Sequence, residues 1–325
     1  MSFRVGIVGC GNIANTHAKA LDQLEDTRLI ACADIREDRA QAFAEKYGCR
    51  PYPSIHAMLE KEELDAVHLC VPHFLHAPMA ALAAEHGLAV MCEKPPLIER
   101  AQWPLLEEAA GRVPLAFCFQ NRYNANVDAA REILRSGEYG AFRGARAFLT
   151  WDRQAPYYTE SGWRGAWATE GGGVLINQAV HTLDLLVTLL GKPETVEAHM
   201  ANHHLRGVIE VEDTLEAWMT CGGRPVILYA TTAYAANSPV MIELEFERAA
   251  VRLEKTALEI RTEGDIERRD FSGAQCLGKD YWGSGHQLCI ADFYHSIEKG
   301  LPLRNGLDSV RDTMDVMLRM YEQNK

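Results

Sequence analysis

The sequence predicts two domains: an α/β domain built on a doubly wound parallel sheet, then an α+β domain with a large, open, mostly antiparallel sheet. In the N-terminal part, short apolar runs typical of strands buried on both faces alternate with segments of helical spacing. In the C-terminal part, strand-like runs follow one another through short turns such as residues 221–225. The length of 325 residues also favours two cores, at ~150 residues per domain. We expect the boundary after Arg122, giving domains 1–122 and 123–325.

Composition argues against several classes of protein. The net charge of −12 disfavours a nucleic-acid surface, because such surfaces need clustered Lys and Arg. No apolar run approaches the ~20 residues of a membrane-spanning helix. The nine cysteines form no C-x-x-C pair, and His199, His203 and His204 lack a further ligand at metal-binding spacing. We therefore expect a cytoplasmic protein with reduced thiols and no nucleic-acid, membrane or metal partner.

The first predicted strand, residues 3–8, passes directly into the pattern G-x-G-x-x-A and a helix start. The six residues of the pattern are Gly9, Cys10, Gly11, Asn12, Ile13 and Ala14. Gly9 would permit a tight turn, Gly11 would let the backbone approach a pyrophosphate, and Ala14 would keep the helix close to the strand. The helix N-terminal amides would then face the phosphates. This arrangement predicts a dinucleotide-binding Rossmann domain, with an ordinary strand–helix–strand unit as the alternative.

The second predicted strand ends at Asp34, twenty positions after Ala14. A carboxylate at this position can accept hydrogen bonds from the adenosine ribose hydroxyls, which favours NAD. Arg36, two residues on, could instead neutralise a 2′-phosphate. The sequence therefore predicts NAD and leaves NADP open.

The next two predicted strands, residues 64–71 and 88–92, end in residues that should face the ligand-binding edge of the sheet. Residues expected to contact the cofactor there are Val71, Pro72, His76, Glu93 and Lys94. Helix capping or packing is the alternative role for His73 and His76. Two prolines follow Lys94 and disfavour a helix, so its ammonium could point at an oxygen on the reacting carbon and stabilise negative charge. The alternative is a surface lysine paired with Glu93.

The remaining elements complete the two domains. A helix at 99–111 and a strand at 114–119 precede Arg122 and Tyr123, which could line a cleft between domains. The second half then contains helices at 126–136, 285–299 and 307–323 and strands at 143–151, 196–204, 211–221, 226–234, 241–247, 250–254 and 257–262.

A helical segment interrupts those strands and carries candidate catalytic residues. After the glycines of 171–173, Asn177, His181 and Asp184 recur at i, i+4 and i+7 and should share one face. His181 is the expected general acid or base, because its reference pKa of ~6.5 suits proton transfer near neutrality. Asn177 would orient a substrate hydroxyl, and Asp184 would fix the imidazole. The alternative is a histidine hydrogen-bonded inside the core.

With these motifs, the whole chain resembles the Gfo/Idh/MocA family of glucose-fructose oxidoreductase, inositol dehydrogenase and related enzymes. The resemblance rests on the glycine pattern, Asp34, the Glu93-Lys94-Pro95 motif and the glycine-led helix with His181. It implies a Rossmann domain and an open-faced sheet domain through which family members often form dimers or tetramers. It also implies that Lys94 and His181 are catalytic.

The resemblance also indicates a substrate class. The family often has aspartate where this chain has Asn177, and the preceding Trp163 and Arg164 look more like the sugar-acting and nucleotide-sugar-acting branches. Trp163, Arg164, Arg122, Tyr123 and Asp184 are the expected substrate contacts. The expected activity is an NAD(P)-dependent hydride transfer to or from a secondary alcohol or ketone of a sugar, cyclitol or sugar derivative. A redox-neutral glycosidase or lyase acting through a keto-sugar, and a non-catalytic NAD(P)-binding regulator, are the alternatives.

Overall fold

The computed structural model describes residues 2–271 and 285–324. Internal contacts divide the chain into two compact units, one of residues 1–120 with 286–310 and one of residues 121–285 with 311–325. The first division falls two positions before the boundary expected at Arg122. The segment 286–310, by contrast, packs with the N-terminal unit although it lies near the end of the chain.

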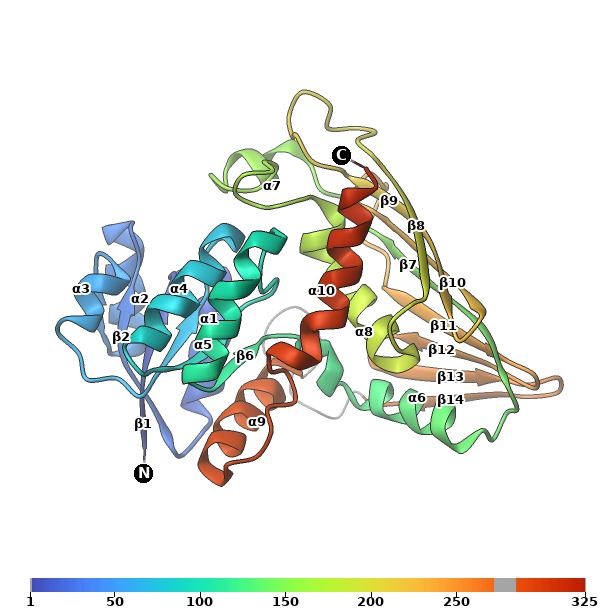
Figure 1. The fold of residues 1–325 in the computed structure, drawn as a ribbon, viewed down its shortest axis with the longest axis horizontal. Helices are drawn as coiled ribbons and strands as arrows, with labels where there is room; N and C mark the ends of the chain where they lie inside the picture. The colour runs from blue at the N-terminus through green and yellow to red at the C-terminus, as the bar shows by residue number, and fades with distance from the viewer. Residues whose placement is uncertain (1, 272–284, 325) are drawn as a thin grey trace. The chain divides into compact units, whose positions relative to one another are not determined.

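The first unit contains a six-stranded sheet in the order β3-β2-β1-β4-β5-β6, and all of its strand pairs are parallel (Figure 1). Its strands are β1 (Phe3–Val8), β2 (Thr27–Ala33), β3 (Arg50–Tyr52), β4 (Ala66–Leu69), β5 (Ala89–Cys92) and β6 (Leu115–Phe117). Its helices are α1 (Asn12–Asp22), α2 (Glu37–Tyr47), α3 (Ile55–Leu59), α4 (His76–Glu85), α5 (Trp103–Arg112) and α9 (Gly285–Lys299), with 3-10 turns at His73–Leu75 and Arg100–Gln102. This order confirms the predicted doubly wound sheet, and the strand order reverses between β1 and β4.

The central strands of this sheet are buried on both faces, as their continuous apolar runs predict. Every residue of β4 and β5 is buried, and so are the last four of β1. The outer side of β6 is met by the C-terminal segment, because Phe117 N donates to the carbonyl of Asn305 at 2.9 Å and Ala116 forms an antiparallel bridge with Gly306.

The second unit is built on an eight-stranded sheet in the order β14-β13-β12-β11-β7-β10-β9-β8. Its strands are β7 (Phe142–Thr150), β8 (Thr195–Ala201), β9 (Thr214–Cys221), β10 (Arg224–Thr231), β11 (Met241–Phe246), β12 (Ala250–Glu254), β13 (Ala257–Arg261) and β14 (Ile266–Asp270). All pairs are antiparallel except β7 with β10. Its helical elements are a 3-10 turn at Gln120–Tyr123, α6 (Ala125–Ser136), α7 (Ala155–Thr159), a π-helical turn at Leu175–Ala179, α8 (Val180–Leu190) and most of α10 (Leu307–Glu322). The predicted large antiparallel sheet is therefore confirmed.

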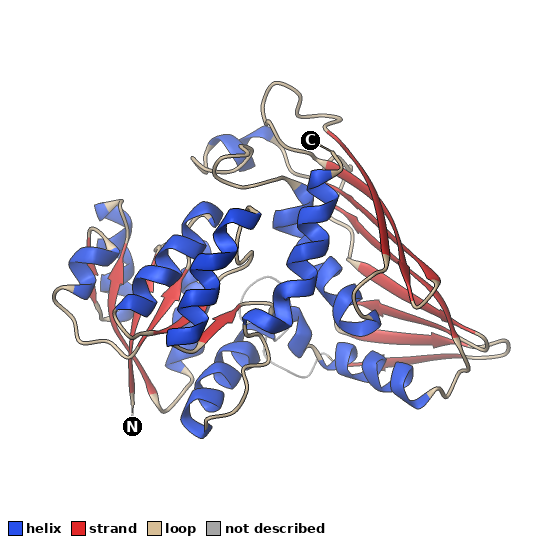
Figure 2. Cartoon of the chain, in the orientation of Figure 1, coloured by secondary structure: helices blue, strands red, loops and turns tan. Residues whose placement is uncertain are grey.

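Only one face of this sheet is covered by helices of the described chain. Figure 2 shows α6 and α8 on the same face, and α6 packs against β12 and β13. Strand β9 shows the corresponding alternation: Leu215, Ala217 and Met219 are buried, whereas Glu216 and Trp218 are exposed. The uncovered face thus presents large side chains to its surroundings.

None of the described helices is both long enough and apolar enough to cross a bilayer.

Candidate active site

The glycine pattern forms a tight turn between β1 and α1. Gly9 has a φ of +86°, and a Cβ on it would lie 2.3 Å from the carbonyl oxygen of Cys70. Only glycine fits there. A Cβ on Gly11 would meet no atom within 4 Å, so the space beyond the turn is open. Asn12 and Ile13 begin α1, whose first amides have no intrahelical partner, and the turn therefore fits a pyrophosphate.

Asp34 follows β2 and is tied to the glycine turn. Its Oδ2 accepts a hydrogen bond from Cys10 N at 2.8 Å, and its Oδ1 accepts one from Arg36 N at 2.8 Å. Each oxygen keeps a lone pair for a ribose hydroxyl. The exposed Arg36 guanidinium pairs with Asp38, with Nη2 and Oδ2 2.7 Å apart, so its charge is already partly neutralised. This geometry favours NAD over a 2′-phosphorylated cofactor.

His76, which the sequence predicts as a cofactor contact, links two loops of the first unit. Its ring is buried, with Nδ1 2.7 Å from the carbonyl oxygen of Pro95 and Nε2 2.9 Å from that of Val71. Burial lowers the pKa of His76, so the ring is neutral and donates to one carbonyl at a time. Because both nitrogens face backbone oxygens, His76 connects the loops after β4 and β5. Val71 and Pro72 remain partly exposed in the first of these loops.

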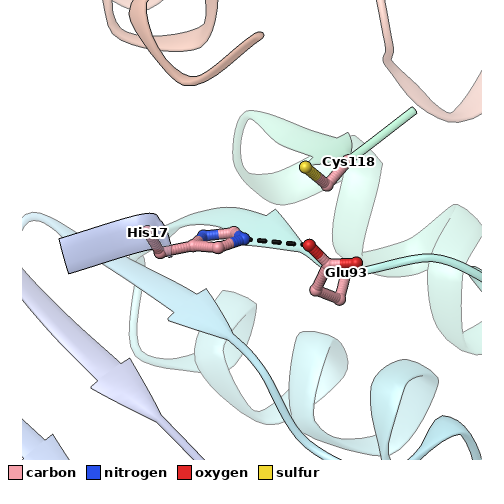
Figure 3. A group of neighbouring side chains, drawn as sticks. All are labelled: His17, Glu93 and Cys118. Atoms are coloured by element: carbon pink, nitrogen blue, oxygen red, sulfur yellow. Dashed lines mark hydrogen bonds and ion pairs between the residues drawn. The ribbon is translucent and has the colours of Figure 1, made fainter. Parts of the chain in front are cut away.

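Glu93 ends a chain of buried hydrogen bonds that begins at α9. Tyr294 Oη lies 2.8 Å from His68 Nε2, the Nδ1 atoms of His68 and His17 are 2.8 Å apart, and His17 Nε2 lies 3.0 Å from Glu93 Oε1. Figure 3 shows the last of these contacts. Although burial alone would raise the pKa of Glu93, its hydrogen bond with His17 holds that pKa well below the usual range. Glu93 is therefore ionised and can only accept.

The ionised carboxylate fixes the direction of the first hydrogen bond in this chain, in which His17 Nε2–H donates to Glu93. Burial lowers the pKa of His68 well below its ordinary value, so His68 is neutral, and its two ring nitrogens are hydrogen-bonded to His17 and to the hydroxyl of Tyr294. The Lys94 amide also lies within 3.3 Å of Glu93 Oε2. The network therefore holds the backbone from which the partly exposed Lys94 side chain extends.

Glu93, His17 and Cys118 form the group of described residues that could hold a metal ion (Figure 3). Their candidate ligand atoms lie within 4.8 Å of one another, and all three residues are buried. The hydrogen bond between His17 and Glu93 already satisfies two of these atoms. A hydrogen bond with Cys289 and burial raise the pKa of the Cys118 thiol well above its ordinary value, which disfavours the thiolate that a metal needs. The donor set therefore fits a hydrogen-bonded cluster better than a metal centre.

In the second unit, the glycine-led segment is tightly packed. A Cβ on Gly173 would lie 1.8 Å from the carbonyl oxygen of Glu212, and one on Gly172 would lie 2.0 Å from the Oη of Tyr321. The Glu212 carboxylate accepts from Gly173 N at 2.9 Å, from Leu175 N at 3.0 Å and from Tyr321 Oη at 2.9 Å. A buried carboxylate thus anchors the start of the π-helical turn.

Asn177 lies in this turn and contacts a carboxylate that the sequence analysis did not single out. Its Nδ2 donates to Oε1 of Glu170 at 2.5 Å, and Tyr157 Oη lies 3.4 Å from the same nitrogen. Oε2 of Glu170 accepts from Gly165 N at 2.5 Å. Glu170 is fully buried, and burial raises its pKa to about 7. Asn177 is partly exposed, and so is His181 in the first turn of α8.

Asp184 forms buried hydrogen bonds that the helical spacing does not predict. Its Oδ2 accepts from Arg122 Nε at 2.7 Å, and its Oδ1 accepts from Arg122 Nη2 at 2.5 Å and from Thr313 Oγ1 at 2.8 Å. Both charged side chains are at most 4% exposed. The π-helical turn adds a residue to the helix, so the α-helical spacing from Asn177 to His181 fails across it, whereas His181 and Asp184 both lie in α8. Arg122 and Asp184 form a buried ion pair, and Tyr123 is buried too, so the role of these three residues as substrate contacts stays a prediction.

Trp163 and Arg164 lie beside Tyr157. The Cζ of Arg164 is 4.5 Å from the centroid of the Tyr157 ring and 4.7 Å from that of Trp163. All three side chains are partly exposed. Because Tyr157 also reaches Asn177, the structure brings these two predicted substrate contacts close to a predicted catalytic residue.

Comparison with known proteins matches both parts of the chain to models of one family. Residues 3–114 match the model described as "Oxidoreductase family, NAD-binding Rossmann fold", and residues 127–252 match the "GFO/IDH/MocA C-terminal domain". Together these ranges cover more than half of the 325 residues.

Individual relatives of the chain are also named as dehydrogenases. The chain is 34% identical to D-glucoside 3-dehydrogenase of Escherichia coli over 61% of its own length and 57% of that protein's. It is 30% identical to inositol 2-dehydrogenase of Rhizobium meliloti, over 62% and 59% of the two lengths. The aligned part therefore spans less than two thirds of either relative.

A solved structure matches nearly the whole chain. It is the WlbA dehydrogenase of Bordetella pertussis in complex with NADH and UDP-GlcNAcA, with a TM-score of 0.86, 26% identity and coverage of 99% of this chain and 96% of that one. With both domain models and the full-length fold in agreement, the chain belongs to the Gfo/Idh/MocA family of oxidoreductases.

Proposed function

We propose that this chain is an NAD-dependent dehydrogenase that acts on a secondary alcohol or ketone of a sugar or sugar derivative. The observation that carries the proposal is the glycine turn joined to Asp34 in one unit, together with the partly exposed Asn177 and His181 in the other. NAD, when bound, accepts hydride from the alcohol carbon or returns it to the ketone. The remaining tasks are to bind the sugar, to move the hydroxyl proton and to stabilise charge on the oxygen.

Each of these tasks has a proposed residue. His181 takes the hydroxyl proton during oxidation and returns it during reduction. The Lys94 ammonium stabilises negative charge as it develops on the substrate oxygen. Asn177 orients the hydroxyl, because its side-chain amide is held in place by Glu170 and the side chain is partly exposed.

The names of the relatives support a sugar-like substrate. They act on a glucoside and on inositol, and the Bordetella protein was solved with a nucleotide sugar. These are properties of those proteins, and for this chain the sugar class is our proposal.

The experiment is to follow reduction of NAD and of NADP across neutral sugars, cyclitols, sugar acids and nucleotide sugars. On the best substrate, Lys94→Ala and His181→Ala should each lower kcat by about 10²- to 10⁴-fold. NAD affinity measured by calorimetry should stay close to that of the parent. Lys192→Ala, which removes a partly exposed lysine paired with Asp312 and Asp315, is the matched control. Unchanged turnover in both variants would refute the assignment, and absence of NADH with glycoside cleavage would favour a redox-neutral enzyme.

We also propose that the uncovered face of the second unit's sheet mediates homodimer or homotetramer formation. Trp218 and Ile227 lie opposite each other on β9 and β10, with 51% and 37% of their surfaces exposed. Exposed apolar side chains on adjacent strands are typical of interaction surfaces. Light scattering after size exclusion should give a multiple of 36.3 kDa, and Trp218→Glu should reduce that mass. A monomeric parent protein would contradict this proposal.

A further inference from the structure

Two arginines of the second unit are stacked on one tyrosine beside Asn177. The Cζ atom of Arg164 lies 4.5 Å from the centroid of the Tyr157 ring, and that of Arg153 lies 5.4 Å from the same centroid. Arg153 also stacks on Trp151 at 4.9 Å. Both arginines are partly exposed. Aromatic rings hold guanidinium groups in place while leaving their N–H donors available to a ligand.

Neither guanidinium forms an ion pair with a carboxylate of residues 2–271 or 285–324. Nη1 of Arg153 donates to two neutral acceptors, the carbonyl of Asp152 and Oδ1 of Asn237, each at 2.6 Å. The Nε of Arg164 is buried and has no acceptor in the described part of the chain. Glu170 is close enough to feel the charge of Arg164, but its oxygens accept from Gly165 and Asn177. In a chain of net charge −12, the two guanidinium groups make this a locally positive site.

The stacked tyrosine joins this positive site to the proposed catalytic residues. Tyr157 Oη lies 3.4 Å from Nδ2 of Asn177 and 3.2 Å from Nε2 of Gln178. One phenol ring therefore separates the guanidinium groups from the amide that we expect to hold the reacting hydroxyl. A substrate that reaches both must carry its charge close to the sugar ring.

We propose that Arg153 and Arg164 bind an anionic group of the substrate, either a carboxylate or a phosphate, while Asn177 binds the reacting sugar hydroxyl. The substrate is then a charged sugar derivative, such as a sugar acid or a sugar phosphate ester, and neither a neutral sugar nor a cyclitol. This inference rests on the proposed function. Arginine suits either anion, because its planar fork matches two oxygens at once.

The test measures binding without turnover, by calorimetry on NAD-loaded protein. The probes are glucuronate for a carboxylate, glucose 1-phosphate and UDP-glucose for a phosphate, and methyl glucoside and myo-inositol as neutral references. At least one charged probe should bind more tightly than both neutral ones, and added salt should weaken its binding. The charged probe that binds identifies the anion.

Variants then assign the binding to the two arginines. Arg153→Gln and Arg164→Gln should each weaken the charged probe by about 10- to 100-fold, the range expected for loss of hydrogen bonds to a charged group. Arg164→Lys keeps the charge without the fork and should weaken it less. Arg224→Gln, at an exposed position of β10, is the control and should change nothing. Thermal unfolding of each variant excludes misfolding as the cause.

The outcomes separate this inference from the proposed function. Neutral probes that bind as tightly as charged ones, or arginine variants that match Arg224→Gln, would overturn the inference even if the protein oxidises sugars. Charged probes that bind through Arg153 and Arg164 without NADH formation would support the inference and leave the dehydrogenase activity refuted.

Discussion

Replacing Asp184 by alanine should destabilise the second unit by about 3–5 kcal/mol, because it breaks a buried ion pair. The loss removes the bidentate carboxylate partner of the Arg122 guanidinium, whose side chain is only 4% exposed. It also removes the acceptor of the Thr313 hydroxyl. Simultaneous replacement of Arg122 and Asp184 by leucine and alanine should cost less than the sum of the single changes, since no buried charge then remains.

The assay is urea unfolding followed by tryptophan fluorescence and by circular dichroism. Glu267→Ala, which breaks the exposed pair with Arg269 in the same unit, should leave the unfolding midpoint unchanged within error. If Asp184→Ala unfolds like the parent protein but has a raised KM, the pair is not structural, and Asp184 contacts substrate as the sequence first indicated.

Three further predictions concern ionisation, metal and cofactor. Because burial raises the pKa of Glu170 from 4.5 to about 7, its bound proton stabilises the fold fully below about pH 4.5, and this contribution is lost as pH rises through about 7. Unfolding free energies at about pH 5 and pH 8 should therefore differ less in Glu170→Gln than in the parent, whereas the exposed Glu216→Gln should keep the parent's difference. Metal analysis should find no stoichiometric metal, and chelators should leave turnover unchanged; one metal per chain that is lost in Cys118→Ser would contradict the hydrogen-bonded cluster. Asp34→Ala should lower kcat/KM for NAD more than for NADP, and an unchanged ratio would show that Asp34 does not select the cofactor.

Much of the fold follows from local sequence patterns. The apolar run before Gly9 and the acid at Asp34 predict the first two strands and the helix between them, because these features depend on neighbours within a few residues. The register and the strand order of the second sheet have no such local signal. The packing of residues 286–310 with the N-terminal unit was equally invisible, since contacts such as His68 with Tyr294 join positions more than 200 residues apart.

Several side chains of the candidate site have partners that are distant in the sequence and that local patterns do not predict. Helical spacing pairs Asp184 with His181, but the partner that the structure gives Asp184 is Arg122, 62 positions away in the chain. His76 was chosen for its place at a strand end, and its orientation depends on the carbonyl of Pro95. The sequence analysis did not single out Glu170, because an acidic residue before three glycines is typical of an exposed loop. Its burial becomes visible only with the fold, in which Gly165 and Asn177 donate to it. The sequence signal for Glu170 is the run of three glycines that follows it, because such a run indicates a closely packed backbone with buried neighbours.

The return of residues 286–310 to the first unit has a consequence for biosynthesis. When residues 1–120 leave the ribosome, the edge of β6 still lacks the backbone of Asn305 and Gly306, and His68 lacks the hydroxyl of Tyr294. While more than 150 further residues are synthesised, the nascent N-terminal unit therefore has an open strand edge at β6. Over the same period, the His68 imidazole lacks one of its hydrogen-bond partners. Completion of the first unit must therefore follow translation of residues 121–285, which belong to the second unit.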